Sequence, residues 1–344
     1  MTHYNIIGGG IAGASIGYHL ISLGAKVTIY DREDSGQATN ASAGIICPWI
    51  SQRRNKKWYR LVTTGAKYYP DFIKTLEDET GLDTGYTRRG SISLFKNEEK
   101  LALGYNRISK KKDDSPEMGE VKIIPKEDIN HFHPDLNNQY PGIFVEGGGQ
   151  VKGRLLLHAL KTAFLSKGGK WLTQEIPDDL DGYKIYTTGA WGRYQNSGPD
   201  IRHQRSEVLH FKVDSDVPVH TPVIMALGPI YIVEMDLNQF AIGTTHIDTD
   251  SFEAVPSKEN YEYLRGLAER YFPDKKITDV EMLVGLKPYA RDHLPFIGHV
   301  DDSVYVVNGL GATGLTAGPV IGREVARSLM GLDTELNLED YNYV

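Results

Sequence analysis

The stretch Tyr4-Asn-Ile-Ile-Gly8-Gly-Gly10-Ile-Ala-Gly13 decides the fold of this chain of 344 residues. A helix-like segment follows it as far as Gly24, and Val27–Tyr30 predicts a second strand that ends at Asp31. In such a strand-turn-helix-strand unit, the first glycine permits a tight turn, the second lets the backbone approach a pyrophosphate, and the third lets the helix pack closely on the strand. The helix N-terminus presents unpaired N–H groups to phosphates, and the acid holds a ribose hydroxyl. The stretch predicts a dinucleotide-binding unit; the alternative is a glycine-rich turn in an unrelated α/β fold.

Composition and charge are those of an ordinary globular protein. Hydrophobic residues make up 40% of the chain and charged residues 24%. The net charge is −7 and the pI is about 5.9, which argues against nucleic acid as a partner. The basic runs 53–57 and 110–112 are local, and Asp113-Asp114 after the second predicts a solvated loop.

Cysteine content and hydropathy exclude further classes. Cys47 is the only cysteine, so an intrachain disulfide and a zinc cluster are excluded, and we predict no metal site. The glycine pattern begins almost at Met1, which leaves no room for a signal peptide. No apolar run approaches the roughly 20 residues that a transmembrane helix needs. We expect a cytoplasmic protein without a transmembrane segment.

Apolar periodicity and glycine turns predict an alternation of helices and strands. Residues 97–137 are polar and lysine-rich, typical of a peripheral excursion, and 145–151 predicts a turn. Dinucleotide-binding pieces occupy both ends and part of the middle, with antiparallel β material between, so the two domains are interleaved. Helices are predicted over 58–81, 154–167, 257–272 and 317–329, and strands over 90–95, 183–189, 207–213, 223–235, 239–246 and 304–308.

A second glycine-rich turn, Asn308-Gly-Leu-Gly-Ala-Thr-Gly-Leu-Thr316, also joins a strand to a helix N-terminus. A helix N-terminus carries about half a positive charge. Aimed at the pyrimidine end of a flavin, it would stabilise the negative charge of the reduced ring. A helix-capping turn with packing glycines is the equal alternative.

Five motifs together resemble the D-amino-acid oxidase-like FAD oxidoreductases, which include glycine oxidase, sarcosine oxidase and D-amino-acid dehydrogenase. The resemblance covers nearly the whole chain, and the order and spacing of the motifs carry it. They are Ile6–Gly13 with Asp31, Ala38–Gly44, Thr187–Trp191, Gly285–Pro288 with Arg291–Gly298, and Gly309–Thr316.

The resemblance implies a mixed α/β (α+β) fold in which a Rossmann-like FAD-binding domain is interleaved with an antiparallel-sheet substrate domain. The FAD-binding domain would comprise 1–95, 140–205 and 285–344, and the substrate or cap domain 96–139 and 206–284. Asp31 replaces the Glu that is usual in the family and keeps the same acceptor. The implied FAD-binding residues are Gly8, Gly10, Ile11, Ala12, Gly13, Asp31, Arg32, Thr39, Asn40, Ala41, Ser42, Ala43, Gly44, Ile45, Thr188, Gly189, Trp191, Gly309, Gly311, Ala312, Thr313, Gly314, Leu315 and Thr316.

The implied FAD is non-covalent. Relatives that tether the flavin use a Cys near the C-terminal glycine turn or a His in the early loop. Here the only Cys is Cys47, and no His lies between His19 and His131. Relatives also carry a small β-meander after the helix that ends near 167, for which 170–183 is too short. A contact to the adenine end would then be missing or supplied by Glu175-Ile176, and FAD affinity would be lower than usual.

The substrate pocket departs from the family pattern at Lys287. Amino-acid-oxidising relatives bind the substrate carboxylate with the Arg of a Gly-Leu-Arg-Pro motif, because a guanidinium donates two parallel hydrogen bonds. Gly285-Leu-Lys287-Pro288 offers a point charge instead. Lys287 is then a weaker anchor, or the substrate is not a simple α-amino acid, and Arg291 could substitute. The alternatives are an exposed surface lysine and a surface ion pair of Arg291 with Asp292.

Two further residues are candidates for contact with the substrate amine. Tyr231 matches a substrate-facing Tyr of glycine-oxidase-like relatives, and His246 falls at a pocket-lining position on the neighbouring strand. A neutral His could accept a proton from a substrate ammonium. A core tyrosine and a structural histidine are the alternatives. Glycine oxidases place another Arg where this chain has Ala312 or Thr313, so the turn is more similar to that of D-amino-acid dehydrogenase.

The resemblance implies an FAD-dependent enzyme that oxidises the C–N bond of a small amino acid or secondary amine by hydride transfer to flavin N5. Water would hydrolyse the imine, and O2 or another electron acceptor would reoxidise the flavin. Lys287 or Arg291 would hold the carboxylate, while Tyr231 and His246 orient the amine. A dehydrogenase with a quinone or carrier acceptor and a non-catalytic FAD-binding subunit stay open, and an NAD-linked dehydrogenase is the least favoured.

Overall fold

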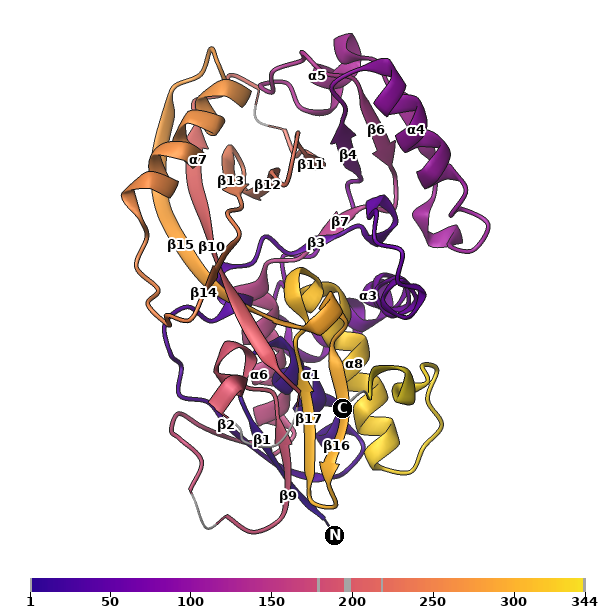
Figure 1. The fold of residues 1–344 in the computed structure, drawn as a ribbon, viewed down its shortest axis with the longest axis vertical. Helices are drawn as coiled ribbons and strands as arrows, with labels where there is room; N and C mark the ends of the chain where they lie inside the picture. Colours follow the sequence, from indigo (N-terminus) through magenta and orange to yellow (C-terminus); the bar gives the residue numbers. More distant parts are fainter. Residues whose placement is uncertain (1, 178–179, 195–198, 218, 343–344) are drawn as a thin grey trace.

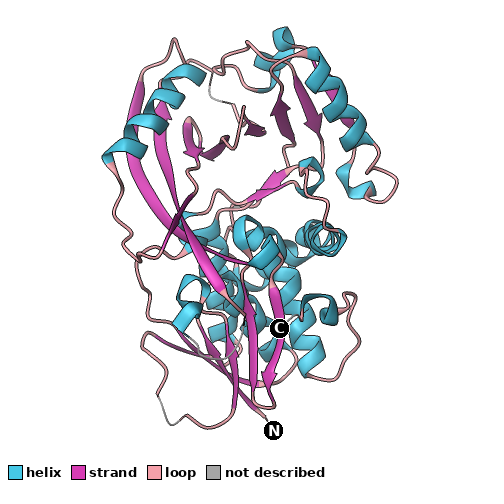
Figure 2. Ribbon diagram, in the orientation of Figure 1, coloured by secondary structure: helices cyan, strands magenta, loops and turns pink. Residues whose placement is uncertain are grey.

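The computed structural model describes residues 2–177, 180–194, 199–217 and 219–342, with the side chains of Arg193, Tyr194 and Arg291 left outside the description. Two lobes are stacked along the long axis, each built on one large sheet (Figure 1). Figure 2 shows most helices gathered in the lower lobe, and helices on the flanks of the upper lobe. The predicted mixed α/β fold with parallel and antiparallel sheets is confirmed.

The lower lobe contains a six-stranded sheet whose first unit follows the prediction. β1 (His3–Ile7) pairs in parallel with β2 (Lys26–Tyr30), and α1 (Ile11–Ser22) connects them. The carboxyl ends of β1, β2 and β9 therefore meet at one edge, where open α/β sheets bind ligands. The sheet order is β16-β17-β9-β1-β2-β8, with β8 Lys170–Leu172, β9 Tyr183–Tyr186, β16 Phe296–Asp301 and β17 Val304–Asn308.

The upper lobe contains a nine-stranded, mainly antiparallel sheet. The predicted run 223–235 is a hairpin of two strands, and the run 239–246 ends at Gly243, so His246 lies between two strands and not on one. The strands are β4 Ser91–Leu94, β5 Val121–Ile124, β6 Gly142–Val145, β10 Ile201–Val213, β11 Val223–Met225, β12 Tyr231–Asp236, β13 Gln239–Gly243, β14 Ile247–Thr249 and β15 Ile277–Ala290.

Two long strands, β10 and β15, connect the lobes. They pair antiparallel from Ile201↔Ala290 to Val213↔Ile277, so β10 runs from the lower lobe to the upper one and β15 runs back (Figure 1). Gln204 of β10 lies opposite Lys287 on one side and Asp248 of β14 on the other. The register therefore gathers polar residues from three strands at the junction. The predicted domain boundaries stay a prediction. They assign β4 and β6 to the FAD-binding domain, whereas both strands pair within the upper sheet.

Helices cover the lower sheet and flank the junction. α3 (Lys56–Thr80) begins at the Asn55 cap, whose side chain accepts a hydrogen bond from the Trp58 amide, and ends at Gly81 in the left-handed conformation. No helix of the described ranges is both long and apolar enough to cross a membrane, and these ranges contain no group of metal-ligating side chains. The remaining long helices are α4 Glu98–Ser109, α6 Gly153–Ser166, α7 Lys258–Tyr271 and α8 Gly314–Leu329.

Candidate functional site

A cavity of about 680 Å³ lies where the two lobes meet, since residues of both sheets line it. Its volume is within the range of small-molecule and cofactor sites, about 300–1,000 Å³. Both glycine turns, the segment 37–53, the end of β9 and the strands β12 and β15 contribute to its wall. The two predicted glycine-rich sites therefore belong to one cavity.

The first glycine turn is closed by protein on two sides and open to the cavity at Gly10. A Cβ on Gly8 would lie 2.5 Å from the Thr187 carbonyl oxygen, and one on Gly13 would lie 1.9 Å from the Gly8 oxygen. A Cβ on Gly10 would meet only the Thr39 hydroxyl, at 3.4 Å, and Gly10 lines the cavity. The Thr39 hydroxyl accepts a hydrogen bond from the Ile11 amide at 3.0 Å. Gly10 is thus the position where the backbone can approach a ligand.

Asp31 is fixed at the same end of the cavity. Its carboxylate is buried and accepts hydrogen bonds from the amides of Gly9 and Glu33 and from the Gln37 side chain. Neighbouring Arg32 pairs with Asp34 at 2.6 Å and with Glu175 at 3.3 Å. Glu175 and Ile176 line the cavity, although the described part of 173–182 forms no strand. The contact of this segment with an adenine stays a prediction.

The second glycine turn faces the middle of the cavity. Asn308 ends β17; its side chain donates to the Gly189 oxygen at 3.0 Å and accepts from the Gly309 amide at 2.7 Å. This side chain joins the turn to the Thr187–Trp191 segment. The first residues of α8, Gly314 to Thr316, line the cavity. A helix start with its partial positive charge therefore borders the ligand space.

Three cavity-lining residues carry buried polar atoms without a hydrogen-bond partner among the described residues. They are the hydroxyl oxygens of Thr188 and Ser206 and the indole nitrogen of Trp58. Buried polar groups in folded proteins are normally hydrogen-bonded, so an exception needs an explanation such as a bound molecule. Together with Asp31 and the two helix starts, these atoms fit a large polar cofactor that extends along the cavity.

Lys287 and His246 form a direct pair at the other end of the cavity. Lys287 Nζ lies 2.8 Å from His246 Nδ1, and both residues line the cavity. Burial, and then the charge of Arg53, lowers the pKa of Lys287 to about 8, while Asp248 opposes this shift. Burial and the charge of Lys287 lower the pKa of His246. At neutral pH the Lys287 ammonium therefore donates to a neutral imidazole, which contradicts the reading of Lys287 as a free surface lysine.

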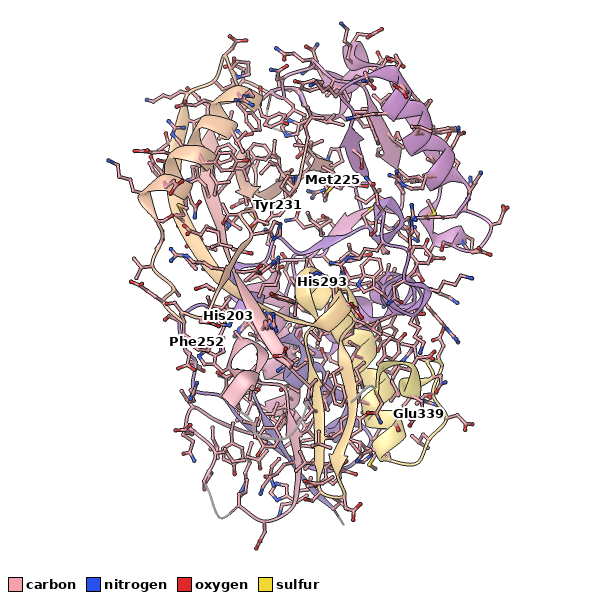
Figure 3. All side chains as sticks on the ribbon, in the orientation of Figure 1. His203, Met225, Tyr231, Phe252, His293 and Glu339 are labelled. Carbon is pink, nitrogen blue, oxygen red and sulfur yellow. The ribbon has the colours of Figure 1, made fainter. Side chains whose placement is uncertain are left out.

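Tyr231 of β12 lines the cavity beside Met225. In Figure 3 both lie in the upper lobe, above His293. Burial raises the pKa of Tyr231, so its phenol stays protonated and can donate a hydrogen bond. The side chain of Arg291 lies outside the described residues, and its predicted role is left as a prediction.

Cys47 also lines the cavity, but its thiol is buried and lies 2.9 Å from the Ser91 hydroxyl. Burial raises the pKa of this thiol to about 12, which keeps it protonated and unreactive. The expectation of non-covalent FAD is consistent with this environment.

The structure gathers most of the predicted site residues and adds others. Every proposed FAD-binding residue lines the cavity except Gly13, Asn40 and Gly309. Gly13 instead packs against Gly8, and the Asn40 side chain bonds to Gln37. The sequence did not single out Arg53, Trp58 and Ser206, which also line the cavity. Arg53 stands in the basic run 53–57, and nothing in the pattern separates it from Arg54.

Comparison with known proteins identifies the family. A family model described as "FAD dependent oxidoreductase" (DAO) matches residues 3–328. The "uncharacterized oxidoreductase YurR" of Bacillus subtilis (strain 168) is 34% identical, covering 99% of this chain and 98% of the relative. Glycine oxidase of Geobacillus kaustophilus (strain HTA426) is 25% identical, covering 99% and 97%. The crystal structure of iminodiacetate oxidase (IdaA) from Chelativorans sp. BNC1 superposes with a TM-score of 0.92 at 29% identity, covering 98% of each chain. The chain belongs to the DAO family of FAD-dependent oxidoreductases.

Proposed function

We propose that this FAD-dependent oxidoreductase oxidises the C–N bond of a small amino acid or secondary amine whose carboxylate pairs with Lys287. The observation that carries the proposal is the Lys287–His246 pair in a cavity whose other walls fit FAD. Relatives named glycine oxidase and iminodiacetate oxidase act on amines that carry carboxylates, which supports the same substrate class here.

The pair also defines which proton each side chain holds. While Lys287 is charged, its ammonium donates to His246 Nδ1, so the imidazole proton sits on Nε2. His246 then donates a hydrogen bond to the substrate. The sequence predicted the opposite role, in which a neutral His246 accepts a proton from the substrate ammonium. Lys287 and His246 together would hold a carboxylate, and the Tyr231 phenol would orient the amine. The neutral form of the amine reacts, so no side-chain base is required.

FAD supplies the acceptor for the hydride that leaves the substrate α-carbon, and water hydrolyses the resulting imine to an oxo acid and ammonia or a primary amine. The protein contributes position: Lys287 and His246 fix the carboxylate, and Tyr231 fixes the nitrogen. Because these three side chains hold the substrate at its carboxylate and its nitrogen, only one hydrogen of the α-carbon points towards the cofactor.

The test is an anaerobic visible spectrum of the purified holoprotein titrated with glycine, sarcosine, proline, iminodiacetate, and D- and L-amino acids. Bleaching of the flavin band by one of them supports the proposal and names the substrate. A flavin that no amine bleaches would overturn it and favour a non-catalytic FAD-binding subunit. Oxygen uptake with the bleaching substrate separates an oxidase from a dehydrogenase with another acceptor.

Carboxylate binding should weaken as pH rises through about 8, the pKa to which burial lowers Lys287. Below that pH the ammonium is charged and pairs with the carboxylate; above it the amine is neutral and the attraction is lost. Methoxyacetate suits the measurement because it has no amine and stays anionic. Its Kd, followed by flavin absorbance, should rise about tenfold per pH unit above the Lys287 pKa.

The matched control for this pH dependence is Lys287→Arg, because arginine stays charged throughout the range. The rise in Kd should disappear in that variant. Arg53, from the segment before α3, and His246 and Asp248, from one stretch at β14, face Lys287. Arg53 stays charged, and His246, with its lowered pKa, stays neutral. A wild-type Kd that is flat through pH 8 would contradict the role of Lys287.

A further inference from the structure

Arg53 places a second cation in the cavity that holds Lys287. It lies in the loop between the 3-10 turn Pro48–Ile50 and α3, whereas Lys287 comes from β15. Both residues line the cavity, and Arg53 is the charged group that lowers the Lys287 pKa most. The guanidinium carbon lies 4.9 Å from the centroid of the Trp58 ring, a cation–π distance. Two cations from separate elements therefore face one space.

A lysine of the upper lobe holds the loop that carries Arg53 in place. Lys111, which follows α4, donates from Nζ to the carbonyl oxygens of Trp49 at 2.6 Å and Ser51 at 2.8 Å. The Ser51 hydroxyl accepts a hydrogen bond from the Arg53 amide at 3.2 Å. One lysine of the polar excursion 97–137 therefore holds the backbone immediately before Arg53. Lys111 is a positioning residue for the cavity wall.

The charge of Arg53 has no carboxylate partner in the described part of the chain. Among the described residues, neither Arg53 nor Lys287 forms an ion pair with a carboxylate. The carboxylates that line the cavity, Asp31, Asp34 and Glu175, stand at the first-turn end beside Arg32. The indole nitrogen of Trp58, below the Arg53 guanidinium, is buried and without a partner in the described part of the chain. An anion at Arg53 would meet a charge and a free N–H donor, and would relieve repulsion between two cations.

We propose that Arg53 is a second anion-binding residue of the substrate site, and that the substrate is a secondary amine with a carboxylate on each side of its nitrogen. This rests on the proposed function. One carboxylate pairs with Lys287 and His246, and the other with Arg53 and the Trp58 N–H. A single carboxylate occupies the Lys287 position and leaves Arg53 unpaired.

The reaction balances for such a substrate. A C–H bond of one carboxyalkyl arm breaks, the hydride passes to FAD, and the amine proton is released to water. Water adds to the carbon of the resulting C=N bond, and the C–N bond breaks. The products are an oxo acid and a primary amino acid that keeps the other carboxylate. An external acceptor, O2 or an electron carrier, removes the two electrons from the reduced FAD.

The experiment compares two unreactive ethers on the oxidised holoprotein. Oxydiacetate has two carboxylates and methoxyacetate has one, and neither has an amine to oxidise. Flavin absorbance gives both Kd values. We expect oxydiacetate to bind about 10- to 100-fold more tightly, the effect of one hydrogen-bonded charge. Arg53→Met should remove this preference and leave methoxyacetate binding no weaker. Arg53→Lys should keep part of it, and the neighbouring Arg54→Met should keep all of it.

Equal Kd values for the two ethers in the wild type would overturn the proposal. So would an Arg53→Met variant that weakens both ethers to the same degree, since Arg53 would then act on the site as a whole. The proposed function fails on a different result, namely that no amine bleaches the flavin. In that case the ratio of the two ether Kd values still tests whether Arg53 binds an anion. If both hold, iminodiacetate should exceed sarcosine in kcat/KM by a similar factor, and Arg53→Met should remove the difference.

Discussion

Replacing Lys287 with methionine should lower kcat/KM for a carboxylate-bearing amine by about 10²- to 10³-fold while FAD stays bound. Methionine preserves much of the side-chain volume but removes the ammonium that pairs with His246 and, in the proposed complex, with the carboxylate. Loss of one partner of a hydrogen-bonded, desolvated charge pair costs about 2–5 kcal/mol, a factor of roughly 30 to several thousand. Most of the loss should appear in KM, since the carboxylate is held before and during the reaction.

Three controls make the Lys287 result interpretable. The flavin content of Lys287→Met, measured by absorbance, should match that of the wild type. Lys287→Arg restores a cation and should recover most of kcat/KM. Lys212→Met removes an exposed lysine from β10, the strand that pairs with β15, and should change nothing. An unchanged KM in Lys287→Met would refute its assignment as the carboxylate anchor.

The dinucleotide-binding unit could be predicted because its signals are local. The glycine spacing, the apolar run before it and the acid at the end of the second strand all lie within thirty-one residues of sequence. The observed β1, α1 and β2 agree with the prediction, and so does β17, while α8 begins at Gly314 and not at 317. In each case the residues that determine the conformation of the turn lie within the turn itself, so a local sequence pattern is enough to predict it.

β15 could not be predicted because its stability comes from a distant partner. Gly285 and Pro288 interrupt its pattern, and both residue types are unfavourable within a central strand. β15 pairs along its length with β10, and its other side makes only isolated bridges, at Leu286 and Tyr289, among the described residues, so Pro288 is tolerated between them. Gly285 packs against α2 (Ala38–Ala41), where a Cβ would lie 3.0 Å from the Ala41 methyl carbon. The glycine reflects a tertiary contact, which a single sequence does not reveal.

The substrate end of the site was only partly predictable for the same reason. Lys287 and His246 were each candidates, but their direct contact joins residues 41 positions apart and changes the role of the imidazole from acceptor to donor. Arg53 has the same sequence context as Arg54, and only the fixed loop selects one of them for the cavity wall. Motif matching finds the chemistry that a family shares, whereas specificity arises from residues placed by packing.

The glycines of the first turn should fail in two different ways. Gly10→Val should fold and yet lose FAD, because Gly10 has an extended backbone that valine adopts and its added Cβ would meet only Thr39, at 3.4 Å. The rest of the side chain would enter the cavity where a pyrophosphate must approach. Gly13→Val should fold poorly, because its Cβ would lie 1.9 Å from the backbone oxygen of Gly8. The flavin-to-protein absorbance ratio and the apoprotein Tm measure the two effects separately.

Added FAD should distinguish these defects further. Ligand at 100 times its Kd stabilises a native protein by about 2.7 kcal/mol, so the wild-type Tm should rise with FAD. The Gly10→Val Tm should begin near the wild-type apoprotein value and not respond to FAD. Gly266→Val, on the exposed face of α7 with no atom within 4 Å of an added Cβ, should respond like the wild type. A yellow Gly10→Val protein would contradict this prediction, because the cofactor would then approach the first turn at a position other than Gly10, the glycine of that turn with the most space for a side chain.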